Sequence, residues 1–261
     1  MYLEKLLVTL LAAPVIAPVP ATVAHQVVAQ APAQPAAPAP QAAPKAEAPK
    51  AAEAPKPAEK KVAPEVKDLV ERMQAFYEKT QDFTSEFKQD YKYKALRRTQ
   101  TSTGKVIYKK PGLMRWEYEK PSKRTFVLAG EKVYAYDPEA QTLSVGRIDT
   151  SQLSASVTFL FGQGKLADEF SISKGECKDC KGTLLVLDPL KNEPRFRQVR
   201  LEVDPKTAQV LKSTVVDPDG SENAIAFLNL KTNVGIAADA FKLNPPEGTR
   251  IDDFTKMQQR K

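Results

Sequence analysis

The spacing of apolar residues along the chain changes between Tyr77 and Phe83. Pro64 suits the first turn of a helix, and the apolar residues that follow it recur at helical spacing: Val66, Leu69, Val70, Met73, Phe76 and Tyr77. From Phe83 onward the period is two, with Phe83, Phe87, Tyr91 and Tyr93 on one parity. The sequence therefore predicts an amphipathic helix that leads directly into a β-strand.

Short segments with strand character continue along the chain. We predict further strands at 105–108, 115–118, 125–128, 132–136, 142–145, 170–173, 183–187, 197–203, 210–216 and 224–230. Turn residues separate them at 129–131, 204–207 and 217–220, where Gly, Pro and Asp concentrate.

A second helical stripe interrupts the strands. It consists of Leu153, Val157, Leu160 and Phe161, with candidate capping residues at 149–151 and Gly162 as a terminator. So many strands at regular spacing predict a mainly β protein, an unclosed antiparallel β-barrel or curved sheet capped by the two helices. A curved sheet covered by two short helices encloses more interior than its side chains fill, so we expect an apolar cavity.

The first 64 residues have a different composition. Between 30 and 64 the chain is nearly all Ala, Pro, Lys, Glu and Gln, which offers too little apolar surface to offset the entropy of ordering. We expect three parts: an export signal at 1–29, a disordered Ala/Pro/Lys-rich linker at 30–64, and one folded domain at 65–261.

Lys5 and the apolar run 6–19 are typical of an export signal, because the run is short and contains Pro14 and Pro18. Ala24 or Ala29 is the expected last residue removed. An uncleaved membrane anchor is the alternative, in which case the linker becomes a tether. No Cys lies near the cleavage point, so the pattern does not predict a lipid-anchored N-terminus.

The net charge of +7 raises the possibility of an anionic partner. In the predicted domain, however, basic residues alternate with acidic ones, and no basic helix or aromatic-rich basic strip is present, so we expect no nucleic acid partner. Weak attraction to anionic phospholipid headgroups remains compatible with the charge.

Motifs for catalysis are missing from the sequence. The single histidine, His25, lies in or beside the export signal, so the predicted domain has no residue for a Ser-His-Asp or Cys-His site. Phosphate-binding, dinucleotide and His-bearing metal motifs are also missing, and Asp252-Asp253 is predicted to be an exposed end segment. We therefore expect no enzyme, no catalytic residues, no metal and no cofactor.

Cys177 and Cys180 form a C-x-x-C pair between Gly-containing flanks that predict a loop. A redox or metal function fits poorly, since no strand feeds a helix here and no second ligand pair exists in the sequence. We expect a disulfide that stiffens the loop in an oxidising compartment.

The region 109–118, Lys-Lys-Pro-Gly-Leu-Met-Arg-Trp-Glu-Tyr, is followed by Pro121 and by Tyr134-Ala135-Tyr136-Asp137-Pro138. Together with Phe83-x-x-x-Phe87-x-Gln89, Gly104 and Phe241-x-Leu243-x-Pro245-Pro246-x-Gly248, it resembles the periplasmic outer-membrane lipoprotein carrier family, LolA. The landmarks run in the same order from about residue 65 to 252, so the resemblance covers the predicted folded domain and none of the first sixty or so residues.

The resemblance implies a periplasmic carrier that binds the acyl chains of outer-membrane lipoproteins in an apolar cavity. Such a carrier receives its cargo from an inner-membrane lipoprotein-releasing ABC transporter and passes it to an outer-membrane lipoprotein acceptor. We expect a monomer. A lipid-sensing regulatory protein built on the same half-barrel, and a carrier of another lipid, are the alternatives.

The resemblance also implies functional residues. In the family, a basic residue before the signature proline bonds backbone carbonyls of the lid helices and holds the empty cavity shut; the matching residue is Lys110, for which a solvated strand-end lysine is the alternative. Leu113, Met114 and Trp116 are assigned to the cavity, although Met114 and Trp116 also suit plain core packing. Leu153, Val157 and Leu160 match the family's lid helix, and their packing face would be the gating face.

Overall fold

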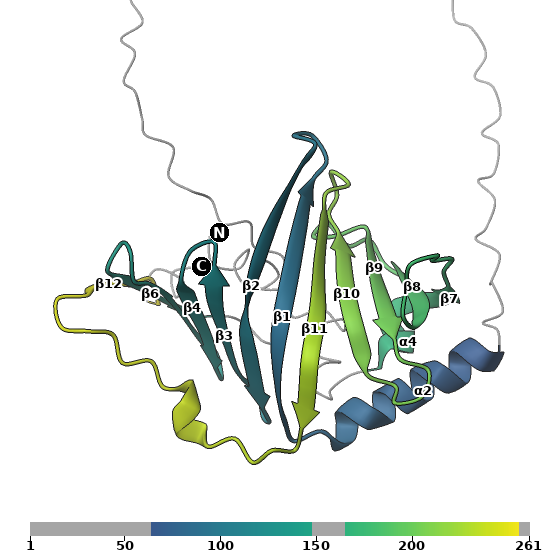
Figure 1. Ribbon diagram of the computed structural model, residues 1–261, viewed down its shortest axis with the longest axis horizontal. Coiled ribbons are helices and arrows are strands. Elements are labelled where there is room, and N and C mark those ends of the chain that lie inside the picture. The colour runs from purple at the N-terminus through teal and green to yellow at the C-terminus, as the bar shows by residue number, and fades with distance from the viewer. Residues whose placement is uncertain (1–63, 148–164, 256–261) are drawn as a thin grey trace, which may run out of the picture. The chain divides into compact units, whose positions relative to one another are not determined.

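The computed structural model describes residues 64–147 and 165–255, and these form one large sheet with short helices (Figure 1). The leading helix is α2 (Pro64–Lys79), as the apolar stripe predicts. The strands of the first half are β1 (Asp82–Tyr93), β2 (Arg98–Lys109), β3 (Leu113–Lys120), β4 (Arg124–Ala129), β5 (Lys132–Asp137) and β6 (Thr142–Arg147).

The second half begins with a short helix and continues with strands. Its elements are α4 (Leu166–Glu169), β7 (Phe170–Lys174), β8 (Thr183–Pro189), β9 (Gln198–Val203), β10 (Val210–Val216), β11 (Glu222–Thr232), the 3-10 helix η3 (Ala238–Phe241) and β12 (Arg250–Asp253). Each predicted strand is present, and several extend beyond their expected bounds. The predicted helix with Leu153, Val157 and Leu160 lies outside the described residues.

The sheet is unclosed, with the strand order β12-β6-β5-β4-β3-β2-β1-β11-β10-β9-β8-β7. Two meanders, β1 to β6 and β7 to β11, are joined where β1 pairs with β11. Neighbouring strands are antiparallel, as predicted, except that β12 pairs with β6 in parallel. Asp252-Asp253, predicted to be a plain exposed end segment, instead belongs to that added edge strand, although Asp253 is exposed.

One face of the sheet, here called the inner face, packs against α2. Val66, Leu69, Met73 and Tyr77 of α2 are all buried, each contributing about 1.5–3 kcal/mol of burial free energy. They join a cluster with inner-face side chains of the second half, among them Leu185, Leu187, Val199, Leu201 and Val203.

A second cluster occupies the inner face of the first half. It contains Phe83, Phe87, Val106, Tyr108, Trp116, Tyr118, Leu128, Val133 and Ile225, with Met114 and Phe126 packed against it. Phe227 packs against both clusters, so the apolar layer is continuous across the inner face. Gly104 is required here, since a Cβ at this position would lie 2.0 Å from the carbonyl oxygen of Glu117 and 2.9 Å from the Phe87 ring.

Candidate functional site

The C-terminal end of α2 is attached to the end of β2 by one lysine. Lys110, which follows β2, donates from Nζ to the backbone oxygens of Glu78 (2.7 Å) and Tyr77 (3.1 Å). Its backbone N–H donates to the Gln81 oxygen at 2.8 Å. These carbonyls belong to the last turn of the helix and to the connection after it, where acceptors have no helical partner, so the lysine supplies the missing donors.

Partial burial lowers the pKa of Lys110, and the neighbouring charge of Glu78 opposes this change. An ammonium group that gives up water recovers the loss through hydrogen bonds to oxygens, and two helix-end carbonyls at the negative end of the dipole provide them. The structure thus places the predicted lock residue against the backbone of the leading helix.

Two other contacts hold α2 along its length. Arg72 donates from Nη1 to the Pro205 oxygen at 2.8 Å, and the backbone N–H of Val210 donates to the Tyr77 hydroxyl at 3.1 Å. Burial raises the pKa of Tyr77, and the hydrogen bond from Val210 opposes part of this change. The helix is therefore joined to the sheet by four buried apolar side chains, by the partly buried Val70 and Phe76, and by a small number of separate polar contacts.

The signature residues after Lys110 lie on β3. Met114 and Trp116 face the inner side together with Tyr108 and Val106 of β2, the residues paired with them across the strands. Trp116 is 2% exposed, its Nε1–H points to the Met114 sulfur at 2.8 Å, and its ring meets Phe87 edge-on with centroids 4.8 Å apart. Leu113 is half-buried at the start of the strand.

A row of buried polar side chains crosses the inner face beside this aromatic cluster. The Tyr118 hydroxyl donates to Gln89 Oε1 at 3.0 Å, and Gln89 Nε2 donates to Asn223 Oδ1 at 2.9 Å. Burial raises the pKa of Tyr118, so it remains a donor at neutral pH. Gln89 and Asn223 are 2% and 1% exposed, so these bonds offset what their burial would otherwise cost.

Arg115 lies between Met114 and Trp116 on β3, so it has the opposite parity and lies on the outer face. It donates from Nη1 to the backbone oxygens of Lys242 (3.1 Å) and Ala240 (3.3 Å) and pairs with Glu117. A groove of about 370 Å³ lies beside this contact. Arg115 thereby holds the segment around η3 against β3.

The same segment is attached at its start by Asp82, a residue that the sequence analysis did not single out. The buried Asp82 carboxylate accepts backbone N–H groups of Val234 (2.7 Å), Gly235 (3.1 Å) and Ile236 (3.2 Å). Its position as an acidic residue at the start of β1, directly before Phe83, was a possible signal, but its partners lie far away in the sequence.

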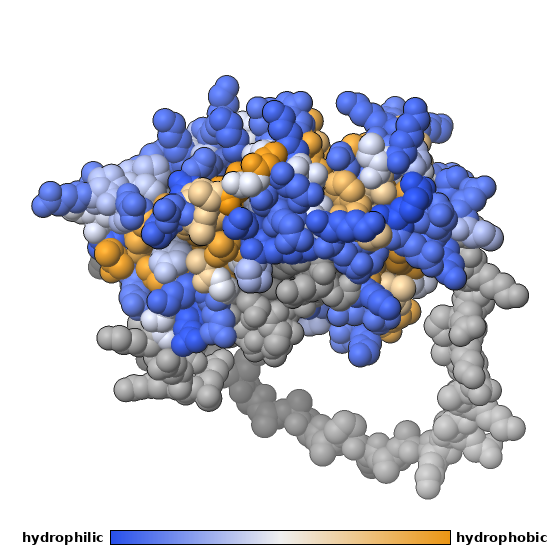
Figure 2. All heavy atoms as spheres, turned by 90° about the horizontal axis from the view of Figure 1, so that it is seen from below, coloured by the Kyte–Doolittle hydropathy of each residue, from blue (hydrophilic) through white to orange (hydrophobic). Residues whose placement is uncertain are grey.

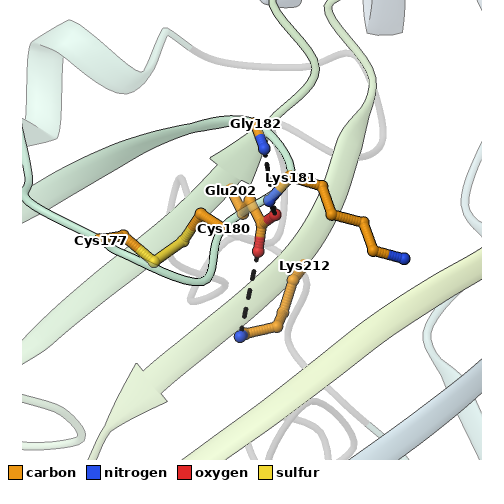
Figure 3. The surroundings of a disulfide bond; sticks show 6 residues. All are labelled: Cys177, Cys180, Lys181, Gly182, Glu202 and Lys212. Carbon is orange, nitrogen blue, oxygen red and sulfur yellow. Dashed lines mark hydrogen bonds and ion pairs between the residues drawn. A yellow bond between two sulfur atoms is a disulfide. The ribbon is translucent and has the colours of Figure 1, made fainter.

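The C-x-x-C pair forms a disulfide in the loop between β7 and β8, with Cα atoms 5.5 Å apart (Figure 3). Glu202 of β9 secures this loop, since its carboxylate accepts the N–H groups of Lys181 (2.5 Å) and Gly182 (3.2 Å) and lies 3.9 Å from Lys212 Nζ. A Cβ on Gly182 would lie 2.3 Å from the Val203 oxygen, which is why the loop needs glycine there. In the described residues, no group of three or more His, Cys, Asp or Glu is placed to hold a metal ion.

Figure 2 views the molecule from the end at which α2 meets β1 and shows apolar surface as separate patches among hydrophilic residues. Within residues 64–147 and 165–255, no helix combines the length and the apolar composition needed to cross a membrane.

An unclosed sheet with a helix packed on its apolar inner face is a fold of the half-barrel class. The chain belongs to the LolA family: the family profile "Outer membrane lipoprotein carrier protein LolA" matches residues 78–244, more than half of the chain. The family's name supports a lipoprotein carrier role and names no reaction.

Similar proteins carry the same name. Outer-membrane lipoprotein carrier proteins of Pseudomonas paraeruginosa and Dechloromonas aromatica are 26% and 27% identical over 183 residues, covering 70% of this chain and 86% of each relative. Among solved structures, a LolA superfamily protein from Nitrosomonas europaea aligns with a TM-score of 0.39 and 10% identity over 68% of this chain and 97% of the other. An uncharacterized conserved protein from Thermus thermophilus aligns with a TM-score of 0.47 and 11% identity over 72% and 98%.

Proposed function

We propose that this chain is a periplasmic carrier that binds the acyl chains of outer-membrane lipoproteins and shuttles them from the inner to the outer membrane. The observation that carries the proposal is the continuous apolar inner face, in a chain of the lipoprotein carrier family. Each methylene transferred from water to such a face contributes about 0.8 kcal/mol, so several long chains would be retained during transit.

Release requires that the apolar face also has a closed state without cargo. The contact between Lys110 and the end of α2 supports a closed state that is held by few hydrogen bonds. Breaking this closed state costs free energy, which offsets part of the free energy gained when acyl chains bind. Met114 and Trp116 supply a deformable thioether and a flat ring on the same face, a pair suited to chains of variable shape. We assign Lys110, Met114 and Trp116 to cargo binding. The other assigned residues are Leu113 and those of the predicted lid helix, Leu153, Val157 and Leu160.

The proposed partners are an inner-membrane lipoprotein-releasing ABC transporter as donor and an outer-membrane lipoprotein as acceptor. The disulfide between Cys177 and Cys180 supports an oxidising compartment, and the leader-like residues 1–29 support export.

The test uses the only tryptophan in the chain, Trp116, as a reporter of the inner face. Titration of the delipidated protein with a synthetic triacylated lipopeptide should change its tryptophan emission and saturate at one ligand per protein. Lipopeptide and protein should then elute together in size-exclusion chromatography. Saturation by a diacyl phospholipid at equal or lower concentration would identify a carrier of another lipid, and no response to either ligand would contradict acyl binding on this face.

A further inference from the structure

The hairpin between β1 and β2 ends in a basic tip with an exposed leucine. Leu96 is 66% exposed, the highest value among the exposed large apolar residues of the described chain, and the side chains of Lys94, Arg97 and Arg98 beside it are exposed too. Both strands are 12 residues long, and Figure 1 shows their shared end projecting beyond the neighbouring strands. A turn needs no leucine, since Gly, Asn and Asp favour such positions, so Leu96 is unexplained by local folding.

The neighbouring turn between β10 and β11 supports the tip through hydrogen bonds. The Tyr91 hydroxyl donates to Asp217 at 2.5 Å, and the Lys94 backbone N–H donates to the Ser221 hydroxyl at 3.2 Å, so the adjacent turn between β10 and β11 supports the hairpin. The rings of Tyr91 and Tyr93 lie 4.5 Å apart, and the Arg98 guanidinium lies 5.4 Å from the centre of the Tyr93 ring. Leucine is thus presented at the apex of a supported structure.

The charge at the apex is positive. From Tyr91 to Thr103 the sequence has four basic residues, Lys92, Lys94, Arg97 and Arg98, and no acidic one. The carboxylates of the supporting turn have hydrogen-bond partners of their own: Asp217 accepts from Tyr91 and Asp219 from Ser221. The charge of Lys94 adds slightly to the lowering of the Asp219 pKa, which hydrogen bonds from Ser221 mainly cause. Glu222, at the start of β11, pairs with Arg200 and Lys92. Among the residues that the structure describes, no carboxylate lies within ion-pair distance of Lys94, Arg97 or Arg98.

We propose that this tip, Lys94 to Arg98 with Tyr93, is a contact site for the headgroup layer of an anionic phospholipid bilayer. Basic groups are attracted to anionic headgroups, tyrosine favours the interface, and one leucine at a convex apex reaches the acyl boundary. A convex tip buries too little area for a stable protein–protein interface. A bilayer can accommodate the tip because its headgroup layer needs no preformed complementary cavity. This contact site is separate from the proposed cargo site, because the tip contributes to neither apolar cluster.

The experiment is vesicle flotation of the full chain with phosphatidylcholine vesicles, with and without phosphatidylglycerol. We expect binding to the anionic vesicles only, weakening as salt rises. Leu96→Asp should weaken it about tenfold, and Arg97→Glu about tenfold. The matched controls lie outside the tip: Leu190→Asp, at a leucine that is 57% exposed, and Lys206→Glu, at an exposed lysine. Both controls should bind like the wild type. All variants keep the same first 63 residues, so this segment contributes equally to each measurement.

A second readout locates the contact. Leu96→Trp adds a reporter at the tip to a chain whose own Trp116 is 2% exposed, and brominated phospholipids should quench the added emission beyond the wild-type level. Three results would overturn the proposal: no flotation with anionic vesicles, equal loss for Leu96→Asp and Leu190→Asp, or no added quenching. Tighter binding to immobilised polyglutamate than to vesicles would replace the bilayer with an acidic protein partner and also overturn it.

Discussion

Lys110 joins a strand end to the last turn of α2 through a single ammonium group. A lysine makes its bonds from one point, whereas the planar fork of an arginine could satisfy both carbonyls with separate N–H groups. The sequence placed this residue at the lock position by resemblance alone. The sequence could not show that its partners are the carbonyls of Tyr77 and Glu78, because every residue has a backbone carbonyl and the residue type does not indicate which one accepts.

Replacing Lys110 with leucine should loosen the end of α2. Lys110→Leu leaves two helix-end carbonyls to water, which we expect to cost about 1 kcal/mol at this half-exposed position. Hydrogen exchange should quicken at the amides of residues 77–82, and cargo should load but release more slowly, because closure no longer offsets binding. Lys110→Arg is the control and should restore protection; unchanged exchange and release in Lys110→Leu would reject the lock.

Met114 tests the inner face directly. Met114→Glu places a carboxylate among Trp116, Tyr108 and Leu128, where burial of a charge without a partner is unfavourable. We expect loading of the triacylated lipopeptide to fall at least tenfold, while Met114→Leu, which conserves volume, should load normally. Wild-type loading by a folded Met114→Glu protein would place Met114 outside the cargo route.

Among the elements, η3 and β12, which follow Asn233, were not predicted from the sequence, and neither was the short helix α4. Strands with alternating apolar residues were predicted because burial of one face imposes a period of two. β12 has no such pattern: Ile251 is 61% exposed, and the strand exists because its backbone pairs with β6. The path of the chain toward that pairing depends on Asp82 and Arg115, whose partners are backbone groups distant in sequence.

Asp82 should be a main attachment of that segment. Asp82→Asn replaces one acceptor oxygen by an amide donor that faces the N–H groups of Val234, Gly235 and Ile236, and we expect a loss of about 2 kcal/mol in the free energy of unfolding. Urea unfolding measures this, and faster hydrogen exchange at 234–241 locates it. The control is Asp90→Asn, at a carboxylate that accepts a hydrogen bond from the exposed Thr101 hydroxyl, and it should lower the free energy of unfolding far less. An equal loss of stability in the two variants would contradict the proposed attachment by Asp82.

The loop between β7 and β8 combines the disulfide with the Glu202 contacts. Replacing Cys177 and Cys180 together by serine frees a short loop in the unfolded chain, so we expect the free energy of unfolding to fall by about 2 kcal/mol. Urea midpoints of the oxidised wild type, the reduced wild type and the double variant are to be compared. The two proteins without the disulfide should agree, and a midpoint equal to the oxidised wild type would show that the Glu202 contacts alone secure the loop.

Across the residues that the structure describes, the sheet joins two meanders through β1 and β11, and β12 and β7 are its edge strands. The resulting inner face carries two apolar clusters and a row of hydrogen-bonded polar side chains between strands. Periodicity predicted the sheet and the leading helix, and resemblance predicted the carrier family. Neither indicated the polar row of Tyr118, Gln89 and Asn223, since only the strand register brings these three residues together.

The most direct test of acyl-chain carriage is native mass spectrometry of the protein purified from the periplasm, followed by extraction of any bound molecule. We expect a complex with a triacylated lipoprotein, one per protein chain, and a smaller bound fraction for Met114→Glu. A phospholipid in its place, or a protein that is free of ligand after gentle purification, would contradict the claim that the apolar inner face carries lipoprotein acyl chains.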